Sequence, residues 1–147
     1  MSVTVREALP QDEAPFRKLW ADYLAFYGVG IADDVTDLTW RRVFDPASAI
    51  FMRVADVDGD VVGFALCLTH EGTWTSSLDC YLEDLFVDAA VRGKGVGRAL
   101  LDDLVSLSKS KGWSRLYWHT DETNATARKL YDRYVESDGH IRYRITL

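Results

Sequence analysis

Apolar and polar residues follow strand spacing in some parts of the chain and helix spacing in others. Residues 3–8 alternate and predict an opening strand. From residue 10 to residue 27, apolar residues recur three and four positions apart, which predicts a helix that ends at Gly28. A shorter helix is expected over residues 35–44, and it ends there because the residue before Pro46 disfavours a helical backbone. The first third of the chain is therefore expected to form one strand and two helices.

The middle of the chain contains three segments with the composition and length of strands. Residues 50–57 and 61–69 are rich in branched and aromatic residues, and Asp58-Gly59 between them is typical of a tight hairpin turn. A loop rich in Thr and Ser over residues 72–77 leads to a third such run at residues 81–87. These segments predict an antiparallel meander.

Beyond residue 87 helices and strands are expected to alternate. A glycine-containing turn over residues 88–96 precedes a helix that extends to about Lys111, with its apolar residues on one face. A short buried strand is expected at residues 115–119, a last helix begins at Thr123 or Asn124, and residues 141–147 alternate as a final strand. The whole order predicts a mixed α+β fold built on one α/β sheet.

Composition and charge narrow the class of protein. The chain has 147 residues, close to the length of about 150 that one domain occupies, so we expect a single domain over residues 1–147. Its 17 Lys and Arg residues are outnumbered by 23 Asp and Glu residues, which gives a net charge of −6. Nucleic-acid binding is disfavoured, because it requires clustered cations against the phosphate backbone.

The apolar segments and the cysteines argue against a membrane protein and a metal protein. The longest apolar run, residues 61–68, is far shorter than the ~20 residues that span a bilayer, and the first residues lack the pattern of a signal peptide. Cys67 and Cys80 lie in apolar runs, as buried thiols in a reducing cytoplasm do, and no Cys/His spacing suggests a metal site. We therefore expect a cytoplasmic protein with no metal and no membrane partner.

The strongest chemical signal is the glycine-rich turn before the long helix. Glycines at positions 93, 95 and 97 leave backbone N–H groups uncovered at a helix N-terminus, which is the usual geometry for holding an anion. Arg92, Lys94 and Arg98 add positive charge in an acidic chain. A solvated turn with glycines as helix punctuation is the alternative, but three glycines with three cations favour the anion site.

Two common phosphate loops do not fit this turn. The dinucleotide fingerprint G-x-G-x-x-G would start at Gly93 but needs glycine where Arg98 stands. The nucleotide P-loop needs Ser or Thr after Gly-Lys, and Gly93-Lys94 is followed by Gly95. Neither ATP nor NAD is favoured.

The turn instead resembles the acetyl-CoA pyrophosphate motif of the GNAT N-acetyltransferase superfamily, through Arg92-x-x-Gly95-x-Gly97 after the strand at residues 85–87. Residues 81–87 are similar to the corresponding strand of spermidine/spermine N-acetyltransferases and of the related histone-and-polyamine acetyltransferase branch, and residues 123–131 resemble that family's late helix. The resemblance implies a GNAT fold, with a single central mixed sheet of about six to seven strands flanked by about four helices. It also implies acetyl-CoA as cosubstrate and no metal.

The resemblance assigns cofactor-binding roles to two segments and two residues. The backbone of Leu85, Phe86 and Val87 would pair with the pantetheine arm, and the Leu85 amide would polarise the thioester carbonyl. Asn124 would cap its helix and reach the cofactor arm, and Ala127 would line it. The pyrophosphate would be held by the backbone of the turn, that is, by Arg92, Gly93, Lys94, Gly95, Val96, Gly97 and Arg98.

The resemblance also implies an acid and a base. Tyr131 matches the family tyrosine that protonates the departing thiolate, although spacing alone is typical of a core aromatic. Glu83 matches the family's strand carboxylate, which either binds the cationic amine or takes its proton through a water. A salt-bridged strand-end acid is the alternative for Glu83, and Asp84 is the fallback. Strict alternation puts Glu83, Leu85 and Val87 on one face of the strand.

The acceptor side is expected to be aromatic. Tyr27, Trp74, Tyr81 and His119 fall where the family forms its acceptor pocket, and aromatic faces suit an ammonium group. Gly28 departs from the polyamine enzymes, which place an acid there.

The expected activity is transfer of an acetyl group from acetyl-CoA directly to a small cationic amine, such as a polyamine or an amino-acid-like amine. The alternatives are a protein or peptide amine as acceptor and a non-catalytic acyl-CoA-binding module. Family members are commonly homodimers, and residues 141–147 would supply an edge for pairing, so we expect a homodimer.

Overall fold

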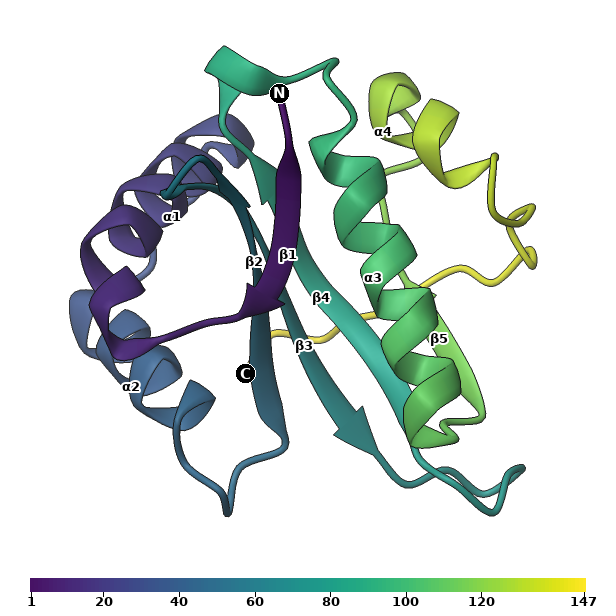
Figure 1. Ribbon diagram of the computed structural model, residues 1–147. Coiled ribbons are helices and arrows are strands. Elements are labelled where there is room, and N and C mark those ends of the chain that lie inside the picture. Colours follow the sequence, from purple (N-terminus) through teal and green to yellow (C-terminus); the bar gives the residue numbers. More distant parts are fainter.

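A computed structural model describes all residues, 1–147, and shows one five-stranded sheet in the order β1-β2-β3-β4-β5. All neighbouring strands are antiparallel except β4 and β5, which are parallel. Helices α1 and α2 cover one face of the sheet, and α3 covers the other (Figure 1). The elements in chain order are β1 (Val3–Glu7), the 3-10 turn η1 (Pro10–Asp12), α1 (Glu13–Tyr27), α2 (Asp33–Val43), β2 (Ile50–Val57), β3 (Asp60–His70), β4 (Asp79–Val87), the 3-10 turn η2 (Ala89–Val91), α3 (Val96–Lys111), β5 (Arg115–Trp118) and α4 (Ala125–Tyr131).

The predicted fold class and most predicted elements are confirmed, and the glycines fix several boundaries. Helix α1 ends at Gly28 and α3 ends at Gly112, both in the left-handed region with φ of +65° and +72°. The turn between β2 and β3 places Asp58 and Gly59 at positive φ, as a tight hairpin requires. None of the helices combines the length and apolar character that crossing a bilayer requires.

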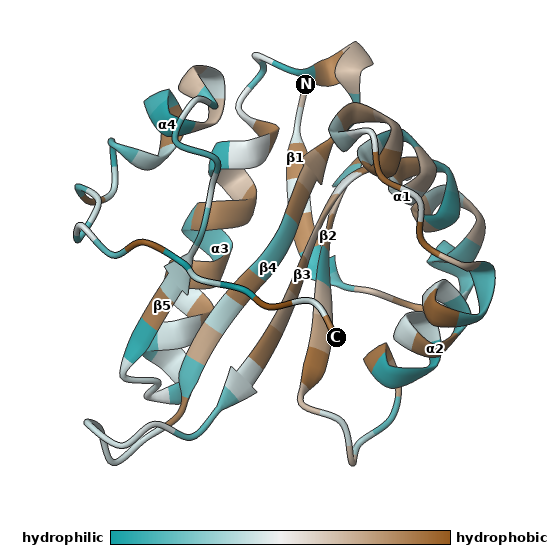
Figure 2. Ribbon diagram, turned by 180° about the vertical axis from the view of Figure 1, so that it is seen from behind, coloured by the Kyte–Doolittle hydropathy of each residue, from teal (hydrophilic) through white to brown (hydrophobic).

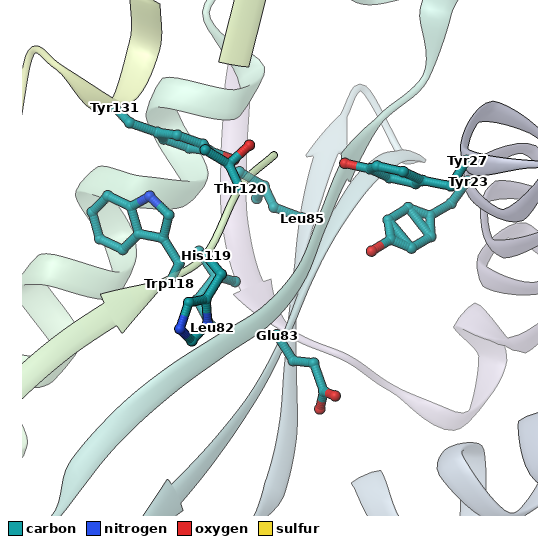
Figure 3. A pocket seen from close by; sticks show the side chains of 9 residues that line it. All are labelled: Tyr23, Tyr27, Leu82, Glu83, Leu85, Trp118, His119, Thr120 and Tyr131. Atoms are coloured by element: carbon teal, nitrogen blue, oxygen red, sulfur yellow. The ribbon is translucent and has the colours of Figure 1, made fainter. Parts of the chain in front are cut away.

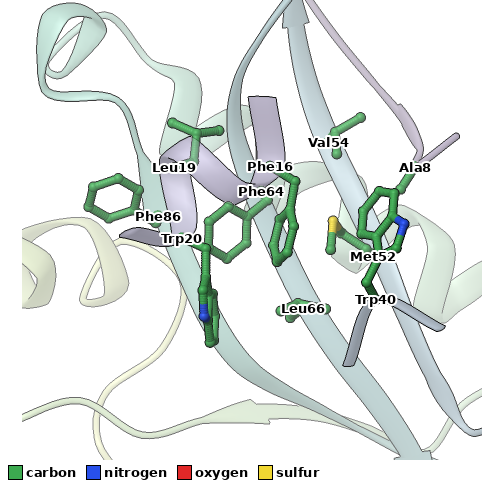
Figure 4. Packing of buried hydrophobic residues seen from close by; sticks show 10 residues of the cluster. All are labelled: Ala8, Phe16, Leu19, Trp20, Trp40, Met52, Val54, Phe64, Leu66 and Phe86. Atoms are coloured by element: carbon green, nitrogen blue, oxygen red, sulfur yellow. The ribbon is translucent and has the colours of Figure 1, made fainter. Parts of the chain in front are cut away.

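Each face of the sheet has its own apolar core. Against α1 and α2, the Phe16 ring lies 5.4 Å from the Trp40 ring and 5.3 Å from the Phe64 ring, within a cluster that also includes Trp20 (Figure 4). Against α3, the buried residues are smaller and include three leucines of that helix, among them Leu104. Both cores converge on β3 and β4, so these central strands are fixed from both faces.

The sheet is further fixed by two ion pairs. Arg6 of β1 donates to both carboxylate oxygens of Asp12, at 2.8 and 3.1 Å, and Asp12 also accepts from the backbone N–H of Leu9. Arg53 of β2 donates to both oxygens of Asp103 on α3, at 2.8 and 2.9 Å. Bidentate pairs of this kind fix orientation as well as distance.

Strand β4 contains a β-bulge that the sequence pattern did not predict. Leu66 of β3 pairs with Asp84 and Cys67 pairs with Leu82, so Glu83 has no partner in the register. The extra residue shifts the alternation, and Glu83 no longer shares a face with Leu85 as predicted. Both Glu83 and Asp84 lie at a cavity beside α1 and α2.

Strands β4 and β5 separate after a short stretch of pairing. The ladder runs from Asp79 opposite Arg115 to Leu82 opposite Trp118 and stops there. From Glu83 to Val87, the edge of β4 that faces β5 therefore has no strand beside it. This opening begins at the carboxyl end of β5, where the ladder with β4 stops.

The predicted final strand over residues 141–147 is wrong. These residues form no strand, and Ile141, Tyr143 and Ile145 are 77%, 88% and 85% exposed. Figure 2 shows the segment after α4 running across β5 and β4 without joining the sheet. Alternation alone does not make a strand, because backbone pairing with a neighbouring edge is required. The sheet consequently has five strands rather than the expected six or seven.

Candidate active site

A pocket of about 50 Å³ lies where β4 and β5 separate, and segments far apart in the sequence meet there (Figure 3). It brings together five of the residues predicted for the site: Tyr27, Glu83, Leu85, His119 and Tyr131. The remaining lining residues are Tyr23, Leu82, Trp118 and Thr120, which the sequence analysis did not assign to the site.

Tyr131 projects into this pocket from α4, while Tyr23 and Tyr27 approach β4 from α1 on the opposite side (Figure 3). The Tyr131 ring packs against Trp118, with the ring centres 5.4 Å apart. Burial raises the pKa of the Tyr131 hydroxyl to about 12, and the hydroxyl has no hydrogen-bond partner in the protein. Tyr131 is therefore protonated at neutral pH and able to donate its proton to a group in the pocket.

The bulge sets two carboxylates side by side with different environments. Asp84 is largely covered and accepts one hydrogen bond from a side chain, the Tyr23 hydroxyl at 2.7 Å. Burial raises the pKa of Asp84 to about 6. The negative charge of the neighbouring Glu83 also raises this pKa, and the hydrogen bond from Tyr23 lowers it. Glu83 is exposed and forms no ion pair. Neither acid has a cationic partner in the chain, so both are available to an external cation.

A second, larger cavity of about 220 Å³ lies between α1, α2 and the sheet. Glu83 is the one residue that lines both cavities. The other lining residues of the larger cavity are Trp20, Ile31, Val35, Thr39, Ile50, Leu66, Cys67 and Asp84.

The glycine-rich turn presents a row of free backbone donors at the start of α3. Gly93 and Gly95 adopt φ of +78° and +84°, which only glycine reaches without strain. The six N–H groups of residues 93–98 donate to no protein acceptor, and the last three belong to the first turn of a 16-residue helix. Unpaired N–H groups and the helix dipole together favour an anion such as pyrophosphate.

Close packing places α4 over this turn. A Cβ added at Gly97 would lie 3.3 Å from the Leu130 side chain and 3.8 Å from that of Val87. Asn124 caps α4, as predicted, by accepting a hydrogen bond from the N–H of Ala127 at 3.3 Å. The turn, the end of β4 and the helix that carries Tyr131 therefore form one packed unit.

The three cations of the turn have different surroundings. The Arg92 side chain faces the protein: its Nε donates to the Val87 carbonyl at 3.0 Å, and its guanidinium lies 5.0 Å from the Phe86 ring centre and 5.4 Å from that of Phe26. Arg98 lies 3.9 Å from Asp102, and Lys94 is exposed. Arg92 thus connects the turn to α1. The backbone N–H groups of residues 93–98 remain available to bind an anion.

Two of the four predicted acceptor residues line the pocket, one lies beside it, and one lies elsewhere. Tyr27 and His119 are lining residues, and the Tyr81 hydroxyl lies 3.3 Å from Nδ1 of His119. Trp74 is not brought to the pocket: it is 88% exposed in the loop between β3 and β4, with Arg115 over its ring. No group of three or more His, Cys, Asp and Glu side chains gathers into a metal site.

Comparison with known proteins agrees with this geometry. The family model described as "Acetyltransferase (GNAT) family" matches residues 13–135. A D-amino-acid N-acetyltransferase of Saccharomyces cerevisiae is 32% identical over 144 residues, covering 97% of this chain and 89% of the relative. An aminoglycoside N(6')-acetyltransferase type 1 of Stenotrophomonas maltophilia is 33% identical over 121 residues, covering 77% of this chain and 72% of the relative. The crystal structure of a ribosomal-protein-alanine N-acetyltransferase from Brucella melitensis has a TM-score of 0.80 at 25% identity, covering 99% of this chain and 100% of the other.

Proposed function

The chain belongs to the GNAT acetyltransferase family and is an acetyl-CoA-dependent N-acetyltransferase, and we propose that it transfers the acetyl group directly to the primary amine of a small molecule. One observation carries the proposal. A carboxylate without a cationic partner, Glu83, and a protonated tyrosine, Tyr131, line the same pocket beside the free edge of β4.

The two residues account for the two proton movements of the reaction. An alkylammonium group with a pKa of about 10.4 must lose a proton before its nitrogen can attack, and Glu83 accepts that proton directly or through a water. The nitrogen lone pair then forms a C–N bond to the thioester carbonyl carbon as the C–S bond breaks. Tyr131 donates its proton to the departing sulfur and is reprotonated by the second proton that the acetylated nitrogen loses, directly or through water.

The donor would lie along the free edge of β4. Backbone groups of Leu85, Phe86 and Val87 would pair with the pantetheine arm, and an N–H of this edge, that of Leu85, would polarise the thioester carbonyl. The N–H groups of residues 93–98 would hold the pyrophosphate. Ala127, which is half-buried and donates its N–H to the Asn124 cap, would line the cofactor arm.

Direct transfer is favoured because the pocket offers no activated nucleophile. The pocket that contains Tyr131 has no cysteine among its lining residues. Cys67 is buried, and hydrogen bonding to Cys80 together with burial raises the pKa of its thiol, whereas acyl transfer through cysteine requires the thiolate.

A small molecule is favoured as acceptor because the site is a pair of modest cavities rather than a long surface groove. The relatives named for D-amino acids and for aminoglycosides support the same choice. Binding of the ammonium group would rely on the two acids and on the faces of Tyr27 and Tyr81.

The proposal is tested by mixing the purified protein with acetyl-CoA and a panel of amines while following free thiol. We expect thiol release with at least one small-molecule amine, with matching acetylated product by mass spectrometry and no acetylation of the protein when the amine is omitted. Release only with lysine or N-terminal peptides would identify a protein acetyltransferase instead. Binding of acetyl-CoA without release on any amine would identify a non-catalytic module.

We also propose a homodimer. The outer edge of β5 has no partner strand, and segment 141–147 exposes the apolar residues Ile141, Tyr143 and Ile145 without joining the sheet. Sedimentation should give twice the chain mass, and removal of residues 141–147 should give a monomer. A full-length chain that sediments as a monomer would contradict this proposal.

A further inference from the structure

The larger cavity has an apolar wall that no part of the chain covers. Trp20 and Leu66 form its inner side and are held by the core around them (Figure 4). Ile31 and Val35 form its outer side and are 38% and 49% exposed. A ligand that covered these side chains would gain about 25 cal/mol for each Å² of apolar surface removed from water.

The charged lining of the cavity is entirely acidic. Glu83 and Asp84 are its only charged lining residues, and no Lys or Arg lines either cavity. An ammonium group is attracted to such a site, whereas a carboxylate on the same ligand would meet like charge with no cation to pair with.

The position of Glu83 fixes the direction of the acceptor. Because Glu83 lines both cavities, an amine that contacts its carboxylate from the pocket with Tyr131 can place its substituent in the larger cavity. The larger cavity, at about 220 Å³, exceeds the roughly 10–15 Å³ that one water needs many times over, so it has room for a small organic group. A phenylethyl or branched alkyl group is of this size.

We infer that the acceptor is a primary amine with a compact apolar side chain and no carboxylate, bound with its nitrogen at Glu83 and its side chain between Trp20 and Val35. The inference rests on the proposed function and names the substrate class of the same site. It predicts discrimination on two separate features of the substrate, size of the apolar group and absence of a carboxylate.

The experiment measures kcat/KM for three amines with acetyl-CoA: 2-phenylethylamine, ethylamine and phenylalanine in both enantiomers. We expect 2-phenylethylamine to exceed ethylamine by about tenfold or more, since each buried CH₂ group contributes about 0.8 kcal/mol and 1.4 kcal/mol is a factor of ten. We expect it to exceed phenylalanine by a similar factor, because the carboxylate of phenylalanine would meet the two acids. The comparison with ethylamine reports on the apolar wall of the cavity. The comparison with phenylalanine reports on the two acids.

Two variants separate the two features. Val35→Trp fills the outer part of the cavity and should lower the ratio of 2-phenylethylamine to ethylamine about tenfold. Val29→Trp is the matched control, because Val29 is 54% exposed and does not line the cavity. Asp84→Asn removes one of the two negative charges and should lower the ratio of 2-phenylethylamine to phenylalanine about fivefold or more.

The outcomes distinguish the two proposals. No turnover of any amine by the wild type would overturn the proposed function itself. Turnover in which phenylalanine equals or exceeds 2-phenylethylamine, or in which a folded Val35→Trp variant leaves the size ratio unchanged or lowers both rates equally, would overturn this inference alone. Thermal unfolding of each variant shows whether it is folded.

Discussion

The structure contains two groups of acidic side chains that differ in their hydrogen-bond and ion-pair partners. At the β1 side of the sheet, Asp12 accepts two hydrogen bonds from Arg6, and Asp103 accepts two from Arg53. On β4, Asp84 at the larger cavity has only the Tyr23 hydroxyl as a side-chain partner, and Glu83 has no ion pair. The pKa of Asp12 is accordingly lowered, chiefly by its hydrogen bonds from Arg6, and that of Asp84 is raised to about 6 by burial.

The contrast separates carboxylates that hold the fold together from carboxylates that are held ready for a ligand. A buried charge is costly unless it is paired, so an unpaired acid persists where a function requires it. The backbone shows the same division: the β3–β4 edge is paired along its length, while the β4 edge beyond Leu82 and the N–H groups of residues 93–98 are free. The backbone groups without partners are therefore those that border the candidate active site.

The largest effect is expected at the proton donor of the opening. Tyr131→Phe removes only a hydroxyl that has no partner in the protein, so the fold and acetyl-CoA binding should be retained. The acetylation rate should fall by ~10² to 10⁴-fold, the range of general acid catalysis. Steady-state kinetics and acetyl-CoA titration check this. Tyr143→Phe is the control, since Tyr143 is exposed on the segment after α4, and equal rates for both variants would remove Tyr131 from the mechanism.

Glu83→Gln keeps the shape of the side chain and removes its charge. If Glu83 is held ready for the amine, kcat/KM for the amine should fall by about 10²-fold or more while acetyl-CoA binding is unchanged. The same substitution at the exposed Glu136 should have no effect. A full rate for Glu83→Gln would leave Asp84 as the acid of the site.

Unfolding measurements compare the two kinds of acid directly. Asp12→Asn should destabilise the protein at pH 7.5 by about 1–3 kcal/mol, because a paired buried carboxylate is lost. Asp84→Asn should stabilise it by roughly 2–3 kcal/mol, because the ionised side chain is disfavoured by burial.

The pH dependence of the two variants has opposite signs. A raised pKa of about 6 against 3.8 in the unfolded chain means that Asp84 costs stability above pH 6 and ceases to do so as pH falls toward 4. A lowered pKa means that Asp12 contributes stability above about pH 4 and loses it only at more acid pH. Urea unfolding at pH 4.5 should therefore shrink the gain from Asp84→Asn by more than half and preserve most of the loss from Asp12→Asn. Parallel pH behaviour of the two variants would break the comparison.

A smaller effect is expected at Arg92, which connects the opening to α1. Arg92→Lys keeps the charge but loses the planar contact with Phe26 and Phe86 and the bond to Val87. A cation–π contact is worth about 0.5–2 kcal/mol, so KM for acetyl-CoA should rise about three- to tenfold with kcat changed by less than about twofold. Arg144→Lys in the segment after α4 is the control, and a large fall in kcat alone would show that Arg92 acts on the chemistry instead.

The sequence predicted the elements well where periodicity and glycines mark them, and the residues of the pocket where a motif identifies them. Its failures share one physical cause, namely backbone pairing between distant segments. Alternation placed Glu83 with Leu85, because a bulge depends on the partner strand and leaves no local signal. Alternation also predicted a strand at residues 141–147, which has no neighbouring edge in the sheet.

Side-chain roles were harder to predict than elements. Tyr23 was predicted only as part of an apolar helix face, yet its hydroxyl holds Asp84. Trp74 was assigned to the acceptor pocket from the family resemblance, but the loop that carries it lies at the other end of β4. In both cases the tertiary neighbour, which a single sequence does not supply, decides the role.

The most direct test concerns the free N–H groups at the start of α3, on which the placement of the donor depends. Gly95 and Gly112 bound the same helix, both at positive φ and both in open surroundings, so valine at either position strains the backbone equally. Calorimetric titration should give one acetyl-CoA bound per chain for the wild type and for Gly112→Val, and binding weakened about tenfold or more for Gly95→Val. Equal affinity in all three proteins, or no binding to the wild type, would contradict the account.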